Sequence, residues 1–208
     1  IQTGALIKKF DTLEGTADDP TGNNRPNGLS SPSAIDINND GSVDAVYAGD
    51  LFGNVWSIDL TGNDPNAWDF KYKSGSDPVP LFTACYGNSC SGSNVQPITT
   101  RIEVVKHPRE SGYLLLFGTG KYFEVGDNAT SGQVTQSFYG IWDKRQSTLT
   151  PFGRSTLQEQ KIIQESVSNN TEYRVTSNNA VDWNTENGWF MDLYNQQSGN
   201  TTNYGERQ

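Results

Sequence analysis

Short apolar runs bounded by turn-forming residues recur along this chain, and no helical pattern of similar length competes with them. Runs of about four to eight residues that alternate or stay apolar, between Gly, Asn and Asp, are typical of β-strands. The 21 glycines and 9 prolines among 208 residues supply the many turns that such strands need. The pattern predicts an all-β fold with strands in the segments 44–48, 54–60, 101–106, 113–117 and 137–143.

Two intervals carry the residues of tight hairpin turns. Residues 49–54 include two glycines, which tolerate positive φ, so the strands on either side are expected to pair. Residues 168–171 are Ser, Asn, Asn and Thr, and they are expected to turn 162–167 back onto 173–175.

The balance of charge restricts the partners. With 15 basic and 24 acidic residues the formal net charge is -9, which opposes attraction to nucleic-acid phosphates and anionic lipid surfaces. The longest apolar run, Tyr113–Phe117, is far shorter than the roughly 20 residues of a membrane-spanning helix. We therefore expect no nucleic-acid partner and no transmembrane segment. The chain opens at Ile1 without a secretion signal and reads like part of a longer protein.

The chain has two cysteines, Cys85 and Cys90, and the short loop between them contains small and polar residues that would let the thiols meet as a disulfide. A disulfide would indicate an oxidising compartment. The alternative is a pair of free thiols. A zinc site is not expected, because His107 is the only histidine.

We expect residues 1–208 to be part of one β domain. The polar, turn-rich segment 11–31 is predicted to be a long connecting loop, and the Gly/Ser/Asn-rich segment 74–94, with both cysteines, an insertion loop.

An apolar residue followed by Asp ends several of the predicted strands. These endings lie at Asp59, Asp143 and Asp192. The last two are about one propeller blade apart, whereas the first interval would need an insertion. A β-sandwich whose strands end alike by chance is the alternative.

The segment from Asp36 to Asp44 carries the strongest candidate site. Oxygen-bearing side chains occupy loop positions 1, 3, 5 and 9, and a glycine occupies position 6. This D-x-[DN]-x-D-G pattern is typical of calcium loops, because Ca²⁺ takes about six to eight oxygen ligands and the glycine permits the sharp turn. The sequence therefore predicts a calcium site formed by the side chains of Asp36, Asn38, Asp40 and Asp44 and the backbone carbonyl of Ser42.

Other interpretations of this loop fit less well. Position 12, where an EF-hand has a bidentate Glu, is Tyr47, and the flanking residues have strand character, so a helical EF-hand is excluded. Magnesium prefers a rigid octahedron with several waters, and transition metals would require nitrogen or sulfur ligands. An ordinary Asx-rich turn without a metal is the main alternative, but its three aspartates would repel one another.

Two further functions stay open on the residues alone. A secreted enzyme, such as a glycosidase with a carboxylate pair like Glu103 and Asp127, would carry a merely structural calcium. A carbohydrate-binding module would use exposed tryptophans, although most of the five lie in strand-like segments where core packing is the expected role. No nucleophile motif such as G-x-S-x-G is present. We expect a binding module and not an enzyme.

Several stretches, spread over nearly the whole chain, resemble the C-terminal domain of the PilY/PilC family of type IV pilus tip-associated adhesins and biogenesis factors. They are Asn27–Pro32, Asp36–Asp44, Tyr47–Trp56, Gln96–Thr99, Leu116–Tyr122, Ser137–Asp143, Gly188–Leu193 and Gly205–Arg207. The resemblance implies a modified β-propeller, of which this chain would form several antiparallel blades. The adjacent-cysteine pair of several quinoprotein propellers is missing, which disfavours a quinoprotein enzyme.

The resemblance also implies a function. It matches the calcium loop position by position, and in this family calcium occupancy of that loop is thought to regulate pilus extension against retraction and surface attachment. The implied location is the bacterial cell surface, at the pilus tip and outer membrane after passage through the periplasm. The implied partners are the pilus machinery or minor pilins, and a host surface receptor through the intact protein.

Overall fold

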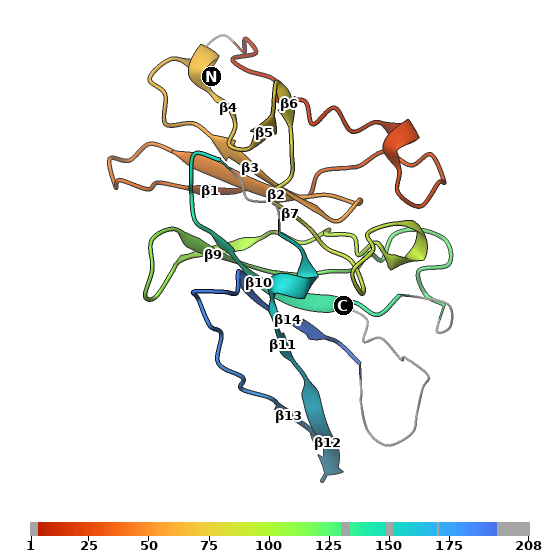
Figure 1. Ribbon diagram of the computed structural model, residues 1–208. Helices are drawn as coiled ribbons and strands as arrows, with labels where there is room; N and C mark the ends of the chain where they lie inside the picture. Colours follow the sequence, from red (N-terminus) through yellow and green to blue (C-terminus); the bar gives the residue numbers. More distant parts are fainter. Residues whose placement is uncertain (1–3, 130–133, 149–151, 170, 195–208) are drawn as a thin grey trace.

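The computed structural model describes residues 4–129, 134–148, 152–169 and 171–194, and the stretch 205–207 of the family resemblance lies outside them. Within the described residues the chain forms two five-stranded sheets and two two-stranded ladders (Figure 1). Helical structure there consists of four 3-10 turns, none long enough to cross a membrane. These are η1 (Thr16–Asp18), η2 (Pro65–Ala67), η3 (Gly92–Asn94) and η4 (Arg154–Thr156). The predicted all-β class is confirmed.

The first sheet follows the order β1–β2–β3–β4, and β7 also pairs with β3. Its strands are β1 (Ser33–Ile35), β2 (Ala45–Gly49), β3 (Asn54–Asp59), β4 (Asp69–Phe70) and β7 (Phe82–Thr83). Asp50 closes the β2–β3 hairpin, since its carboxylate accepts hydrogen bonds from the backbone N–H groups of Phe52 and Asn54 and from the Trp56 indole. Burial raises the pKa of Asp50 above its usual value. The hairpin predicted around residues 49–54 is confirmed.

The second sheet follows the order β11–β14–β10–β9–β8, and β11 alone pairs in parallel. Its strands are β8 (Glu103–Lys106), β9 (Tyr113–Gly118), β10 (Ser137–Asp143), β11 (Gln158–Gln160) and β14 (Gly188–Asp192). The strands β12 (Ile162–Ser168) and β13 (Thr171–Thr176) form a hairpin that extends away from this sheet (Figure 1). This is the hairpin predicted for residues 162–175.

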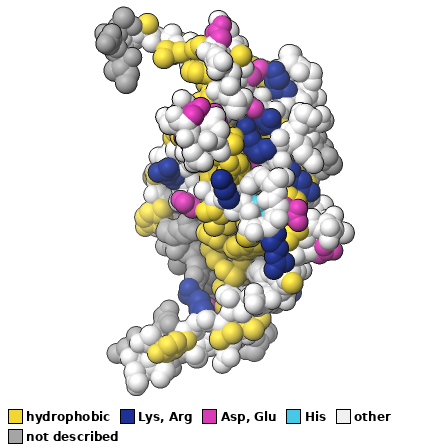
Figure 2. All heavy atoms as spheres, turned by 90° about the vertical axis from the view of Figure 1, so that its left-hand side faces the viewer, with side chains coloured by type: hydrophobic (Ala, Val, Ile, Leu, Met, Phe, Trp, Pro, Cys, Tyr) yellow, Lys and Arg dark blue, Asp and Glu magenta, His cyan; other side chains and the backbone are white. Residues whose placement is uncertain are grey.

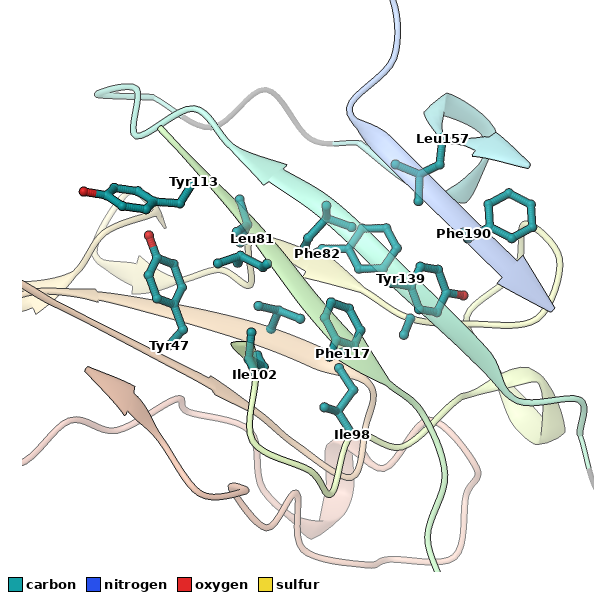
Figure 3. Packing of buried hydrophobic residues seen from close by; sticks show 14 of the residues in the cluster. Tyr47, Leu81, Phe82, Ile98, Ile102, Tyr113, Phe117, Tyr139, Leu157 and Phe190 are labelled. Carbon is teal, nitrogen blue, oxygen red and sulfur yellow. The ribbon is translucent and has the colours of Figure 1, made fainter. Parts of the chain in front are cut away.

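The two sheets pack face to face through an aromatic core (Figure 3). Phe82 of the first sheet lies 5.3 Å from Tyr139 and 6.5 Å from Phe117, measured between ring centroids. Phe117 and Tyr139 are themselves stacked at 5.3 Å. Because large rings from both sheets interdigitate, burial of this face supplies most of the driving force that joins the sheets.

The segment 74–94 connects the two sheets. It begins within the short ladder of β5 (Lys73–Ser74) and β6 (Asp77–Pro78), and it includes β7 and η3. Cys85 and Cys90 are joined by a disulfide, the pairing considered from the sequence. The segment 11–31 runs alongside, where the N–H of Gly92 donates to the carbonyl of Pro20 at 2.7 Å.

A buried carboxylate ties the sheets together at the end of β10. The Asp143 side chain is fully buried, and it accepts a hydrogen bond of 2.7 Å from the hydroxyl of Tyr47 in β2. The hydroxyl of Tyr72 and the backbone N–H of Arg145 donate to the other oxygen. Burial, followed by the charge of Asp143, raises the pKa of both tyrosines well above the usual value. Asp143 is therefore held as an acceptor for donors from both sheets.

We predict that Tyr47→Phe destabilises the chain. The substitution keeps the ring and leaves Asp143 without one of its buried donors, so the free energy of unfolding should fall by about 1–3 kcal/mol in urea denaturation. Tyr122→Phe is the matched control, because Tyr122 is 63% exposed, and it should change stability by less than about 0.5 kcal/mol. Equal effects of the two substitutions would show that Asp143 does not tie the sheets.

Candidate metal centre

The predicted calcium loop joins β1 to β2 at one end of the first sheet. Two backbone hydrogen bonds fix its last residue, because the N–H of Asp44 donates to Ile35 at 2.9 Å and its carbonyl accepts from Leu60 at 2.8 Å. The Asp44 side chain is buried, and its Oδ2 accepts from the N–H groups of Ile37 and Asn38 at 2.8 and 3.3 Å. Asp44 thus ends the loop and anchors it to the sheet.

Asp36 organises the first half of the loop. Its Oδ1 accepts from the backbone N–H groups of Asn39 and Asp40 at 2.6 and 3.3 Å, and its Oδ2 accepts from Gly41 at 2.8 Å. Asn39 and Gly41 have positive φ values of 61° and 89°. These left-handed residues turn the chain around the Asp36 carboxylate, which is the bend that the glycine at position 6 predicts.

Asn38 and Asp40 form the exposed half of the loop. Asn38 Oδ1 accepts from the N–H of Asp40 at 2.9 Å, and Asp40 Oδ1 accepts from the N–H of Ser42 at 2.8 Å. The Asn38 amide also donates to Asp40 Oδ2 at 3.0 Å. The hydrogen bond from Ser42, and then that from Asn38, lower the pKa of Asp40 below its usual value. Asp40 is therefore an anion at neutral pH.

The side-chain oxygen atoms of this loop are the ligand type that a hard cation such as Ca²⁺ prefers. The side chains of Asp36, Asn38, Asp40 and Asp44 present oxygen atoms, and a carboxylate has about four lone-pair sites, so hydrogen bonds from N–H groups leave room for a metal. No ion pair within the described residues involves any of the three aspartates. In the same residues no three Asp, Glu, His or Cys side chains are already gathered as a ligand set. The loop thus has the oxygen ligands that Ca²⁺ requires and a negative charge that no ion pair in the described residues balances. Its side chains are at present held in Asx turns by hydrogen bonds to backbone N–H groups.

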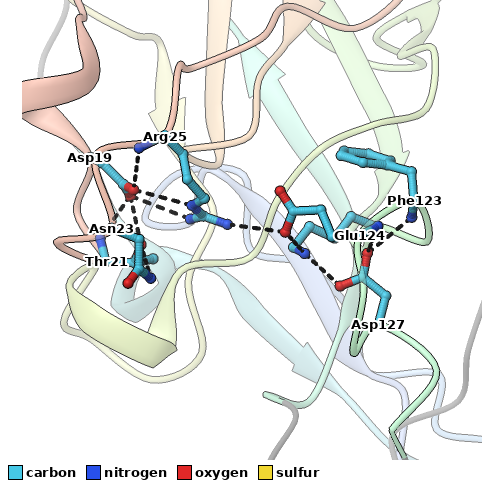
Figure 4. A network of polar contacts seen from close by, with 8 residues as sticks. Asp19, Thr21, Asn23, Arg25, Phe123, Glu124 and Asp127 are labelled. Atoms are coloured by element: carbon cyan, nitrogen blue, oxygen red, sulfur yellow. Dashed lines mark hydrogen bonds and ion pairs between the residues drawn. The ribbon is translucent and has the colours of Figure 1, made fainter.

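A second acidic cluster differs because cations balance it (Figure 4). Arg25 pairs with Asp19 at 3.1 Å and reaches Glu124 at 4.0 Å, while Lys121 bonds both Glu124 and Asp127. Burial would raise the pKa of Asp19, but hydrogen bonds from Arg25 outweigh it and lower that pKa. Asp127, which the sequence offered as half of a glycosidase pair, is engaged in this network. The cluster joins segment 11–31 to the loop after β9 and needs no metal.

Sequence reasoning missed a buried polar network around Arg154, the residue that begins η4. Its guanidinium donates to Asp192 and, at 3.0 Å, to the hydroxyl of Tyr139. Gln96 joins the network by accepting from Tyr139 at 2.6 Å and donating to the hydroxyl of Ser137 at 2.7 Å. Burial raises the pKa of Tyr139 to about 12. The sequence signal is Asp192 at the end of β14, one of the recurring Asp strand endings, but its position does not identify an arginine partner.

His107 and the tryptophans have packing roles. His107 is buried, and its ring lies 4.7 Å from Trp142 and 4.3 Å from Trp183 between centroids. Its Nδ1 accepts from the backbone N–H of Glu110 at 2.8 Å, and burial lowers its pKa below the usual value. Trp56 is 1% exposed. These contacts support the sequence-based expectation that the tryptophans serve mainly in packing.

We predict that Gly41→Ala destabilises the loop through its backbone alone. A Cβ at Gly41 would meet no atom within 4 Å, but its φ of 89° is unfavourable for alanine, so stability should fall by about 1 kcal/mol in urea denaturation. Gly153→Ala is the matched control, because that site is equally open and its φ is -132°. A loss of similar size at Gly153 would contradict the strained turn.

The comparisons with known proteins agree on one family. A family model described as the PilY1 beta-propeller domain matches residues 1–177. The chain is 35% identical over 198 residues to a type IV pilus biogenesis factor PilY1 homolog of Xylella fastidiosa, covering 93% of this chain and 13% of that protein. It is 33% identical over 220 residues to the type IV pilus biogenesis factor PilY1 of Pseudomonas aeruginosa PAO1, covering 93% of this chain and 18% of that protein.

A solved structure has the same fold. The crystal structure of the Pseudomonas aeruginosa PilY1 C-terminal domain matches with a TM-score of 0.73 and 31% sequence identity, over 99% of this chain and 45% of that chain. The chain therefore spans less than a fifth of these two curated relatives and under half of the solved domain. The match over most of its length shows that the chain belongs to the family of PilY1 β-propeller domains of type IV pilus biogenesis factors.

Proposed function

We propose that this chain is a calcium-binding part of a type IV pilus biogenesis factor, in which occupancy of loop 36–44 regulates pilus extension against retraction and surface attachment. The observation that carries the proposal is the loop itself. Its sequence places Asp36, Asp40 and Asp44 within nine positions, without an ion pair among the described residues, in a family of pilus biogenesis factors. The acidic residues of Figure 4 have cationic partners, whereas Asp36, Asp40 and Asp44 form no ion pair within the part of the chain that the structure describes.

The ligands would come from Asp36, Asn38, Asp40 and Asp44 through side-chain oxygens and from Ser42 through its carbonyl. A bound Ca²⁺ would supply positive charge between carboxylates that otherwise repel one another. Asp36 holds the turn by accepting three N–H groups, and Asp44 holds the end of the loop against β3 through Leu60. The chain is thus prepared to order the loop at little further cost in backbone entropy.

The ordered loop would act on the rest of the chain through β2. Asp44 leads directly into that strand, whose Tyr47 donates to the buried Asp143 of the second sheet. A change in the loop would therefore alter a contact between the two sheets.

We further propose that the chain acts at the bacterial cell surface, at the pilus tip and outer membrane. Its partners, as part of the longer protein, would be the pilus machinery, minor pilins or a host surface receptor, and it would have no catalytic activity of its own.

We predict stoichiometric calcium binding that depends on the loop. In isothermal titration calorimetry the chain should bind one Ca²⁺, whereas Asp36→Asn combined with Asp40→Asn should weaken binding at least about tenfold, because two anionic ligands become neutral. Asp44 is left unchanged because it also supports the fold. Asp77→Asn is the charge control, since Asp77 is an exposed residue of β6, and it should bind like the unaltered chain. A folded chain that does not bind Ca²⁺, or binds Mg²⁺ equally, would refute the site.

The regulatory role has a separate test in cells that make the protein. The same double variant should shift surface piliation and twitching motility, and Asp77→Asn should not. If calcium binding is lost in the calorimeter while piliation and motility stay unchanged, the site is structural and the regulatory proposal fails. The measured Kd also separates the two roles, because a switch must have a Kd near the ambient calcium concentration.

A further inference from the structure

A polar pocket lies where the two sheets meet, at the end of β10 that carries Asp143. It encloses about 370 Å³, a volume within the range of small-ligand sites. One wall comes from connections of the first sheet, with Tyr72 after β4 and Leu81 before β7. The other wall comes from Trp142 and the segment that follows β10, from η4, and from the turn before β14. The two sheets therefore form this pocket together.

Backbone hydrogen bonds fix both walls of the pocket. The N–H of Asn187 donates to the carbonyl of Thr156 at 2.9 Å, and the carbonyl of Asn187 accepts from the N–H of Trp142 at 2.9 Å. On the other wall the N–H of Leu81 donates to the carbonyl of Val55 in β3 at 2.8 Å. Because these bonds already hold the walls, a ligand would enter a preformed pocket and would not have to order the backbone around it.

The lining of the pocket suits a ligand that carries several hydroxyl groups. Its hydroxyl and amide side chains, which both donate and accept hydrogen bonds, are Thr148, Thr156, Thr185, Gln146 and Asn187. Gln146 is exposed, so its amide is accessible to a ligand. The amide nitrogen of Asn187 donates to Thr156 at 3.2 Å, which leaves its oxygen as an acceptor. The half-buried Phe152 ring stacks on Phe82 at 5.6 Å and adds an aromatic surface to the same pocket.

Lys144 gives this pocket a positive charge. In a chain with a net charge of -9, none of the described residues that line the pocket is Asp or Glu. Lys144 forms no ion pair in the described part of the chain, and its Nζ lies 4.4 Å from the ring centroid of Trp142. The Trp142 ring is 4.7 Å from His107, and Figure 2 shows Lys and Arg side chains around that histidine. The ammonium group of Lys144 is therefore available to an anionic group of a ligand.

We propose that this pocket binds a carboxylate-bearing sugar residue, such as one uronic acid unit of a polysaccharide. The carboxylate would pair with Lys144, the sugar hydroxyls would bond the amides of Gln146 and Asn187, and one face of the ring would pack on Phe152. A neutral sugar would leave the ammonium group unpaired, and an inorganic anion would leave the amides and the aromatic ring without a partner. The site is separate from loop 36–44, so it adds a function to the calcium site.

The proposal is tested by titration of the chain followed by proton–nitrogen NMR, in which the side-chain amides of Gln146 and Asn187 report directly. The probes are the methyl glycosides of glucuronic acid and galacturonic acid, each beside its neutral counterpart, methyl glucoside or methyl galactoside. At least one acidic sugar should shift both amide signals saturably, and its neutral counterpart should bind at least about tenfold more weakly. Added NaCl should weaken binding of the acidic sugar, because the salt screens Lys144.

Three variants identify the groups that bind the sugar. Lys144→Gln should weaken binding of the acidic sugar at least about tenfold, and Lys144→Arg should retain most of it, because the charge is kept. Gln146→Ala should also weaken binding, and it should fold normally because Gln146 is exposed. Lys106→Gln is the matched control, since Lys106 is an exposed lysine of β8 outside the pocket, and it should bind like the unaltered chain. The backbone signals show whether each variant is folded.

Three results would overturn the proposal. Equal binding of acidic and neutral sugars, unchanged in Lys144→Gln, would show that the ammonium group does not recognise the ligand. Binding of inorganic phosphate, or of a short blocked peptide with one glutamate between glycines, as tight as that of the acidic sugars would make this a site for anions and not for a sugar. A folded chain in which neither acidic sugar shifts the amide signals of Gln146 and Asn187 would show that the pocket does not bind a uronic acid.

Discussion

The rest of this structure depends on the packing of two mainly antiparallel sheets through one aromatic core. Neither sheet could be stable alone, because each is short-stranded and carries large side chains on both faces. The pairing of Phe82 with Phe117 and Tyr139 removes one apolar face of each sheet from water. Asp143, Asp192, Arg154 and the predicted calcium loop all lie at strand ends or in connections, outside this aromatic core.

Buried charges at the strand ends give this packing its specificity. Within the described residues three strands end on an Asp: Asp143 and Asp192 are buried and bond Tyr47 and Arg154, and the partly exposed Asp59 pairs with Arg145. Hydrophobic faces can slide over one another, whereas a buried carboxylate must keep its donors or lose about 1–3 kcal/mol per missing partner. These contacts therefore fix how the sheets are placed, after the apolar faces have brought them together.

The sequence predicted local structure much better than long-range pairing. Strands and hairpins followed from apolar periodicity and from glycine or asparagine turns, and the loop around Asp36 followed from ligand spacing. The partners of Asp143 and Asp192 did not follow, because they are distant in sequence and are chosen by the tertiary fold. Arg154 looked like an ordinary loop residue, although it is buried beneath Phe190 with its guanidinium carbon 3.8 Å from the ring centroid. A single sequence does not show which side chains, distant along the chain, will pair in the folded protein.

The proposed metal loop leads directly into β2, whose Tyr47 bonds Asp143 of the second sheet, so a metal bound there would act on more than its own ligands. Repulsion among Asp36, Asp40 and Asp44 acts at the entry to β2, and Tyr47 in that strand reaches Asp143 in the other sheet. Relief of the repulsion would stabilise the entry to β2, and the gain would extend to the contact between sheets because that contact requires Tyr47 in register with β3. A single loop at the edge of the first sheet would thus bias the packing of both sheets.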